Sequence, residues 1–90
     1  MPLFKVVVHG RGHWISLDDE MERVGFRVTR VVDAADADRA ARKALELVGN
    51  DPKSRPEPGH PAATLTVDDV APAAALPDPQ PGFAFYPDPE

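Results

Sequence analysis

Apolar and polar residues alternate through the first third of the chain, as they do in half-buried β-strands. Phe4, Val6 and Val8 fall on one side of the segment 3–9, and alternation resumes over 13–17. Gly10-Arg11-Gly12 interrupts the pattern, and glycine inside a strand pattern typically marks a bulge or a bend. The spacing therefore predicts one strand that is bent at its middle.

A second alternating segment covers residues 23–32. Its apolar residues share one side with Arg30, and they are Val24, Phe26, Val28 and Val32. The acidic stretch 18–22 between the two segments predicts a polar turn. Two alternating segments joined by a short turn indicate an antiparallel hairpin whose apolar face needs a cover.

Small apolar residues at helical spacing supply that cover. The residues that form a single stripe are Ala37, Ala40, Ala41, Ala44, Leu45 and Val48. This spacing predicts a helix with one buried face. Asp36 is the expected N-cap, and Gly49 is the expected left-handed stop.

The composition changes at Gly49–Asn50, because ten of the eleven prolines follow that point. Residues 63–67 alternate again and predict a third strand, which ends in a turn at Asp68-Asp69. Prolines at 72, 77, 79 and 81 favour polyproline II over 71–81. The last residues are unexpectedly aromatic for a tail, and Phe83–Tyr86 is a candidate fourth strand.

These elements predict an α+β fold in the order β-β-α-β, with one helix on a small antiparallel sheet and a proline-rich C-terminal arm. We expect an α+β core at 1–70 and a proline-rich linker at 71–81. An aromatic tail at 82–90 is expected to dock on the core or on a dimer mate, because Phe83 and Phe85 alternate around Ala84 as in a strand.

Charge narrows the class of partner. Acidic and basic residues balance over 1–50, so the net charge of −5 resides in 51–90. An acidic arm opposes binding to phosphate backbones and favours a protein partner. Neither a signal-peptide pattern nor an apolar run of membrane-spanning length is visible. We therefore expect a cytoplasmic protein that neither contacts a membrane nor binds a cofactor.

Three histidines are the candidate metal ligands: His9, His13 and His60. Their spacing matches no established zinc motif, and the chain has no cysteine. Surface or half-buried histidines are the plainer interpretation. No serine or threonine has a neighbouring base and orienting acid, which favours a non-catalytic protein. A small metal-dependent enzyme stays as an alternative.

Candidate interaction residues are those expected to be apolar or cationic and uncovered: Trp14, Arg27, Phe83, Phe85 and Tyr86. One helix leaves the second sheet face open, so a homodimer is also expected. An alternative is a nucleic-acid face that combines a stacking ring, Trp14, with cations, although the acidic arm argues against it. Its arginines would be Arg23, Arg27, Arg30, Arg39 and Arg42. The leading hypothesis is a non-catalytic protein-interaction or regulatory module of a bacterial cytoplasm.

Two family resemblances accompany this hypothesis. Phe4-Lys5-Val6-Val7-Val8, Gly10-Arg11-Gly12 and the ending Gly82-Phe83-Ala84-Phe85-Tyr86-Pro87 resemble a group of short bacterial proteins with a Gly-Phe-x-Phe-Tyr/Phe-Pro tail and no established activity. That resemblance implies an integral tail. The stretch Gly25–Val48 is similar to HicB-type antitoxin domains, although here the strand leads directly into the helix. It implies an antitoxin-like, nucleic-acid-associated regulator as an alternative.

Overall fold

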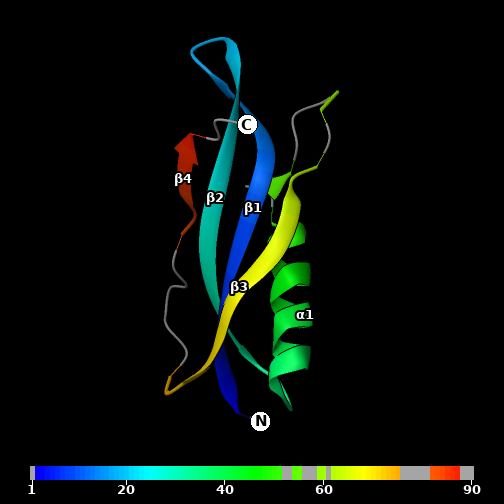
Figure 1. Ribbon diagram of the computed structural model, residues 1–90, viewed down its shortest axis with the longest axis vertical. Helices are drawn as coiled ribbons and strands as arrows, with labels where there is room; N and C mark the ends of the chain where they lie inside the picture. The colour runs from blue at the N-terminus through cyan, green and yellow to red at the C-terminus, as the bar shows by residue number, and fades with distance from the viewer. Residues whose placement is uncertain (1, 52–53, 56–58, 61, 76–81, 88–90) are drawn as a thin grey trace.

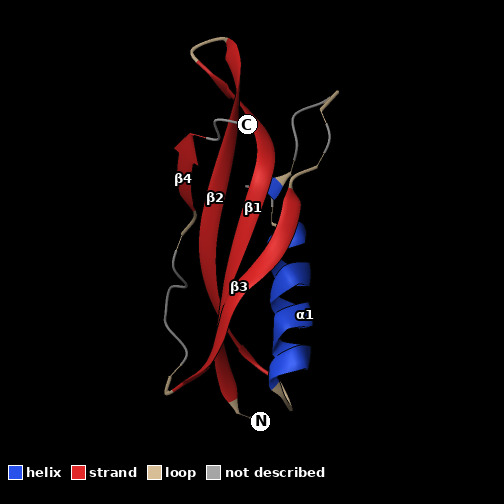
Figure 2. Ribbon diagram, in the orientation of Figure 1, coloured by secondary structure: helices blue, strands red, loops and turns tan. Residues whose placement is uncertain are grey.

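A four-stranded antiparallel sheet carries one helix on one of its faces (Figures 1 and 2). The computed structural model describes residues 2–51, 54–55, 59–60, 62–75 and 82–87. The elements in chain order are β1 (Leu3–Leu17), β2 (Glu20–Asp33), α1 (Ala37–Gly49), β3 (Thr64–Ala73) and β4 (Ala84–Pro87). The strand order is β3-β1-β2-β4. This confirms the predicted α+β class and its fourth strand.

The side of the sheet that α1 covers is the helix face, and the opposite side is the open face. The apolar rows predicted for the first two strands lie on the helix face. The core consists of Val6, Val8, Phe26, Val28, Val32, Ala34, Ala40, Ala44 and Val48. No helix in the described ranges is long and apolar enough to cross a membrane.

The β1–β2 turn is shorter than predicted. Asp18 and Asp19 alone form it, with φ angles of 50° and 67°. Two-residue hairpin turns with positive φ match the twist of the flanking strands, and aspartate tolerates this region better than most residues. The prediction of a turn over 18–22 is therefore wrong. Its last three residues extend β2, and Glu22 pairs with Ile15.

The glycine step at the middle of β1 is a β-bulge, as predicted. Gly10 pairs with Phe26 and His13 pairs with Val24, so Arg11 and Gly12 lie opposite Gly25 alone. Gly12 has a φ of 70°, a conformation that suits glycine. The extra residue places His13 on the helix face together with Gly10.

One close contact in the core depends on the absence of a side chain. The ring of Phe26 lies directly over Gly10 of the neighbouring strand, and Phe26 is fully buried. A Cβ at Gly10 would come closer than 3.0 Å to three carbons of that ring. The glycine therefore lets the largest core side chain lie flat against β1.

The start of α1 agrees with the prediction from the sequence, but its end does not. The Asp36 carboxylate accepts a hydrogen bond of 2.8 Å from the amide of Arg39, which confirms the predicted N-cap. The expected left-handed stop at Gly49 is wrong, because Gly49 is helical and the C-cap is Asn50, with a φ of −92°. The hydroxyl of buried Ser54 donates to the Val48 carbonyl, so a side chain satisfies a terminal group there.

The helix stripe is narrower than predicted. Ala40, Ala44 and Val48 are fully buried, whereas Leu45 packs against the core only partly covered. Ala37 is exposed, contrary to the prediction, because it is the first helical residue and lies at the end of the contact.

β3 is longer than predicted, and the expected turn at Asp68-Asp69 is wrong. Asp69 pairs with Val7 and Val67 pairs with Val8, so Asp68 is the extra residue of a second bulge. The strand then continues to Ala73, beyond the expected core boundary at 70. Pro72 is tolerated because β3 is an edge strand. The polyproline II prediction for 71–81 is wrong over 71–73, which belong to β3, and its part at 76–81 lies outside the described residues, as do 88–90 of the tail.

An exposed ion pair joins α1 to the end of β2. The Lys43 ammonium donates to the Asp33 carboxylate at 2.7 Å and to the Asp33 carbonyl at 3.1 Å. This hydrogen bond, together with the positive charge of Lys43, lowers the pKa of Asp33 below its ordinary value of 3.8. A lowered folded-state pKa adds stability above the ordinary value, and this stability is lost as pH falls through the folded pKa. Because the pair is exposed, its effect on stability is small.

We expect Lys43→Met to raise the pKa of Asp33 toward its ordinary value, since both the hydrogen bond and the charge disappear. A carboxyl-detected NMR titration of Asp33 measures this change. Arg42→Met is the control, because it removes a cation from the exposed part of the same helix. Equal Asp33 pKa values in the Lys43→Met variant and the wild type would show that the pair does not form.

Candidate functional site

The outer edge of β4 is not paired with any other strand in the part of the chain that the structure describes. β4 pairs with residues 24–27 of β2 through its inner edge, and it ends the strand order on that side. All four of its residues are exposed, and Ala84-Phe85-Tyr86-Pro87 contains no charge. An uncharged edge strand presents main-chain groups with which another strand can pair.

The opposite edge, β3, is protected against such pairing. It contains the Asp68 bulge, the charge of Asp69 and the proline at position 72. Bulges, charges and prolines are the devices with which proteins block edge-to-edge association. β4 is short and ends in Pro87, but it has neither a charge nor a bulge. The two edges of the sheet therefore differ in how open they are to a partner.

Aromatic packing holds β4 on the helix face. The Phe26 ring centroid lies 5.1 Å from that of Phe83 and 5.8 Å from that of Phe85. Buried His13 also stacks on Phe85, at 6.0 Å. Because these rings belong to β1, β2 and the tail, they fix the position of the edge strand.

A cation adds to this contact at the start of the tail. The Arg30 guanidinium lies 5.6 Å from the Phe83 ring centroid. It is also 3.5 Å from the Asp51 carboxylate, and the Arg30 side chain is only 14% exposed. These contacts explain why Arg30 can lie among the apolar residues of β2, because its methylene groups are covered while its guanidinium is paired.

On the open face, Tyr86 secures the same strand. Its ring lies over Gly25, where a Cβ would come within 2.5 Å of the ring. Its hydroxyl shares a hydrogen bond with the imidazole of His9, and the two rings stack at 5.7 Å. β4 is thus anchored on both faces, while no other described strand pairs with its outer edge.

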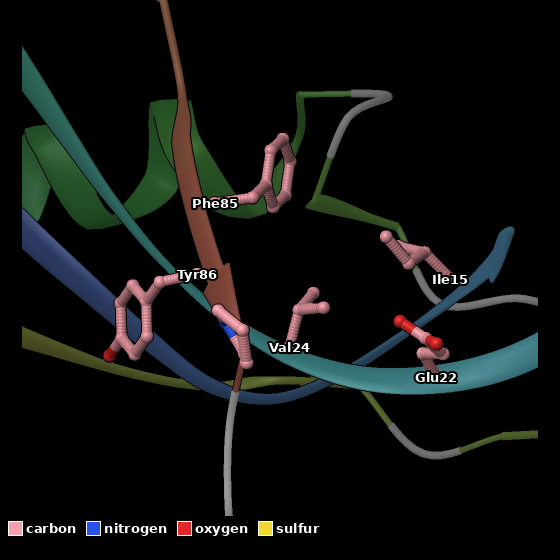
Figure 3. Close-up of a pocket in the computed structure, with 6 residues that line it drawn as sticks. Ile15, Glu22, Val24, Phe85 and Tyr86 are labelled. Carbon is pink, nitrogen blue, oxygen red and sulfur yellow. The ribbon is translucent and has the colours of Figure 1, made fainter.

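A hollow of about 340 Å³ lies beside β4 on the helix face (Figure 3). Its lining residues are Ile15, Glu22, Val24, Phe85, Tyr86 and Pro87. The hollow exists because the β1–β2 hairpin extends beyond the end of α1 (Figure 1), so the helix does not cover this part of the helix face. Its volume is at the low end of the range for ligand pockets.

The lining of the hollow is apolar, with one carboxylate. Figure 3 shows Phe85, Val24 and Ile15 around the same space, with Glu22 near Ile15. Tyr86 points to the other side of β4. Phe85 is 44% exposed, whereas Val24 is 6% exposed and forms the floor. Such a lining suits the binding of an apolar chain that ends in a cation.

The three predicted metal ligands are not brought together. His9 lies on the open face, His13 is buried on the helix face, and His60 stacks on Trp14 at 5.0 Å. Within the described ranges no group of three metal-ligating side chains occurs. The bulge at Arg11-Gly12 separates His9 from His13, because it changes which residues share a face.

Three of the predicted interaction residues lie close together, and the other two have separate partners. Phe83, Phe85 and Tyr86 come together at β4 and include the exposed edge. Trp14 is not among the residues that line the hollow and contacts His60 instead. Arg27 lies on the open face, 3.7 Å from the Asp68 carboxylate, with 65% of its side chain exposed.

The predicted interaction residues did not include four of the lining residues, which are Ile15, Glu22, Val24 and Pro87. Val24 was expected in the core, and Glu22 was placed in a turn. The signal was present in Asp18-Asp19, because a two-residue turn there pairs Glu22 with Ile15 on one face.

Comparisons with protein-family models, with curated proteins and with solved structures found no match to this chain.

Proposed function

We propose that this protein is a non-catalytic protein-binding module in which an extended segment of a partner protein pairs with the outer edge of β4. The observation that carries the proposal is an exposed, uncharged edge strand directly beside an apolar hollow. Strand addition uses main-chain hydrogen bonds for affinity and side-chain pockets for selectivity. β4 offers the main-chain groups, and the hollow offers a side-chain pocket.

The size of the edge sets the strength of such a complex. Four residues offer few main-chain hydrogen bonds, and each contributes about 0.5–1.5 kcal/mol net. Filling the hollow adds burial of apolar surface. A small interface of this kind suits transient rather than permanent association.

Other partners have less support. Trp14 and Arg27 on the open face favour nucleic acid, but Arg27 already contacts Asp68, and the net charge of −5 repels phosphates. A second copy pairing through its own β4 would bring two chains of charge −5 together. A separate protein of opposite charge is therefore the better-supported partner.

Selection of random peptides displayed on phage tests the proposal, with the full chain as the target. We expect selected peptides, once synthesised, to slow hydrogen exchange of the β4 amides. Phe85→Lys is expected to abolish binding, because it removes an apolar wall and places a charge on the edge.

Leu47→Lys is the matched control, because Leu47 is similarly exposed, at 47%, but lies on α1. Failure to enrich peptides, or protection of amides away from β4, would contradict the proposal. A dimer in light scattering that Phe85→Lys dissociates would assign the edge to a second copy instead.

A further inference from the structure

Building on this proposed function, we infer that the partner segment inserts an arginine or lysine into the hollow. The aliphatic part of that side chain packs against Phe85 and Val24, and its cation pairs with Glu22. The hollow is thus a binding site for a long cationic side chain of an extended peptide.

The geometry of strand addition requires a long side chain. Every second residue of an added strand lies on the helix face, next to Phe85 and Pro87. Glu22 belongs to β2, which is two strand positions from the added segment. At about 4.8 Å per position the two backbones lie roughly 10 Å apart. Arginine and lysine can bridge that distance while their methylene groups cover apolar surface.

Charge selects a cation for the end of that side chain. Glu22 is the charged member of the lining, and the hairpin end beside it carries Asp18, Asp19 and Glu20. An uncharged ligand would cover the Glu22 carboxylate partly without pairing it, which is unfavourable. A basic segment would also be steered toward a chain of net charge −5.

The same arrangement already exists within the protein. Arg30 places its guanidinium over the ring of Phe83 and beside the carboxylate of Asp51. In the hollow, Phe85 and Glu22 offer a second ring and carboxylate, also on the helix face. Arginine is the better fit of the two cations, since its planar group stacks on rings and pairs with carboxylates.

The test repeats the peptide selection on three targets: the wild type, Glu22→Lys and Glu46→Lys. Glu46 is an exposed carboxylate on α1, so its substitution changes net charge equally without touching the hollow. Melting curves of the three proteins check that all are folded. We expect arginine or lysine at a fixed position in peptides from the wild type and Glu46→Lys, and loss of that preference with Glu22→Lys.

A second measurement isolates the ion pair. In the tightest-binding selected peptide, replacing the cationic residue by methionine should weaken binding to the wild type about tenfold. The same replacement should leave binding to Glu22→Lys unchanged. Peptides that protect β4 without a dependence on the cation would overturn this inference and leave the proposed function standing. If no peptide protects β4, both fail.

Discussion

Gly10→Val is expected to lower the free energy of unfolding by about 3 kcal/mol, because it overpacks the core. The new Cβ would collide with the ring of Phe26, which is fully buried and has α1 and the tail rings around it. The ring can yield only by leaving the core or by pushing β1 away from β2. For a domain with total stability of roughly 5–15 kcal/mol, such a loss is large.

Chemical denaturation of the purified full chain measures this loss. Gly82→Val is the matched control, since a Cβ at Gly82 meets no atom within 4 Å and its φ is not positive. Phe26→Leu replaces the ring by a smaller side chain and should partly rescue the stability of Gly10→Val. The double variant should therefore lose less stability than the sum of the two single losses. A wild-type midpoint for Gly10→Val alone would refute the contact between Gly10 and Phe26.

Removing residues 82–90 is expected to cost about 2–4 kcal/mol of unfolding stability, because Phe83 and Phe85 no longer cover Phe26. Part of the gross gain from burial is offset by the entropy of ordering the tail. Residues 24–27 of β2 would also lose β4 and would then pair with β1 alone. Hydrogen exchange at the amides that pair with β4 should therefore accelerate most.

The two contributions of the tail can be separated. Replacing both Phe83 and Phe85 by serine in the full chain removes the aromatic packing but keeps the backbone. We expect this variant to lose most of the stability that truncation removes, since four residues of pairing contribute less than two large rings. A truncated chain with the same melting temperature as the wild type would mean that the tail does not pack on the core.

The alternation of residues in the first two strands was sufficient to predict the sheet and its apolar face. Phe4, Val6 and Val8 lie on the helix face as expected, because a half-buried strand repeats every two residues. The N-cap role of Asp36 could be predicted equally well, because few side chains cap a helix effectively. Signals of this kind are local and need no knowledge of the neighbouring elements.

The errors arose where one residue type serves two structures. Asp18-Asp19 and Asp68-Asp69 both look like turns, yet the first pair forms a tight turn and the second lies in β3. Only the pairing of each strand with its neighbour distinguishes them. Gly49 was misassigned for a similar reason, because Ser54 and Asn50 complete the helix end in place of a left-handed glycine.

The hollow could not be predicted, because it depends on relative lengths rather than on a motif. It opens where the β1–β2 hairpin continues beyond the last turn of α1 and where Phe85 lies beside that gap. The prediction that Phe83, Phe85 and Tyr86 form an interaction surface identified part of its wall. Which residues face them follows only from the register of β4 on β2.

The bulge at Arg11-Gly12 also determines how related chains should be compared. In a chain with one residue fewer at this point, Arg11 alone would lie opposite Gly25, and His13 and the residues after it would keep their partners on β2 and their faces. Relatives that lack the extra residue should therefore show one unbroken alternation of apolar and polar residues from the start of β1 to the hairpin turn. An alignment that omits a one-residue gap at the bulge would pair surface positions with core positions between the bulge and the hairpin turn.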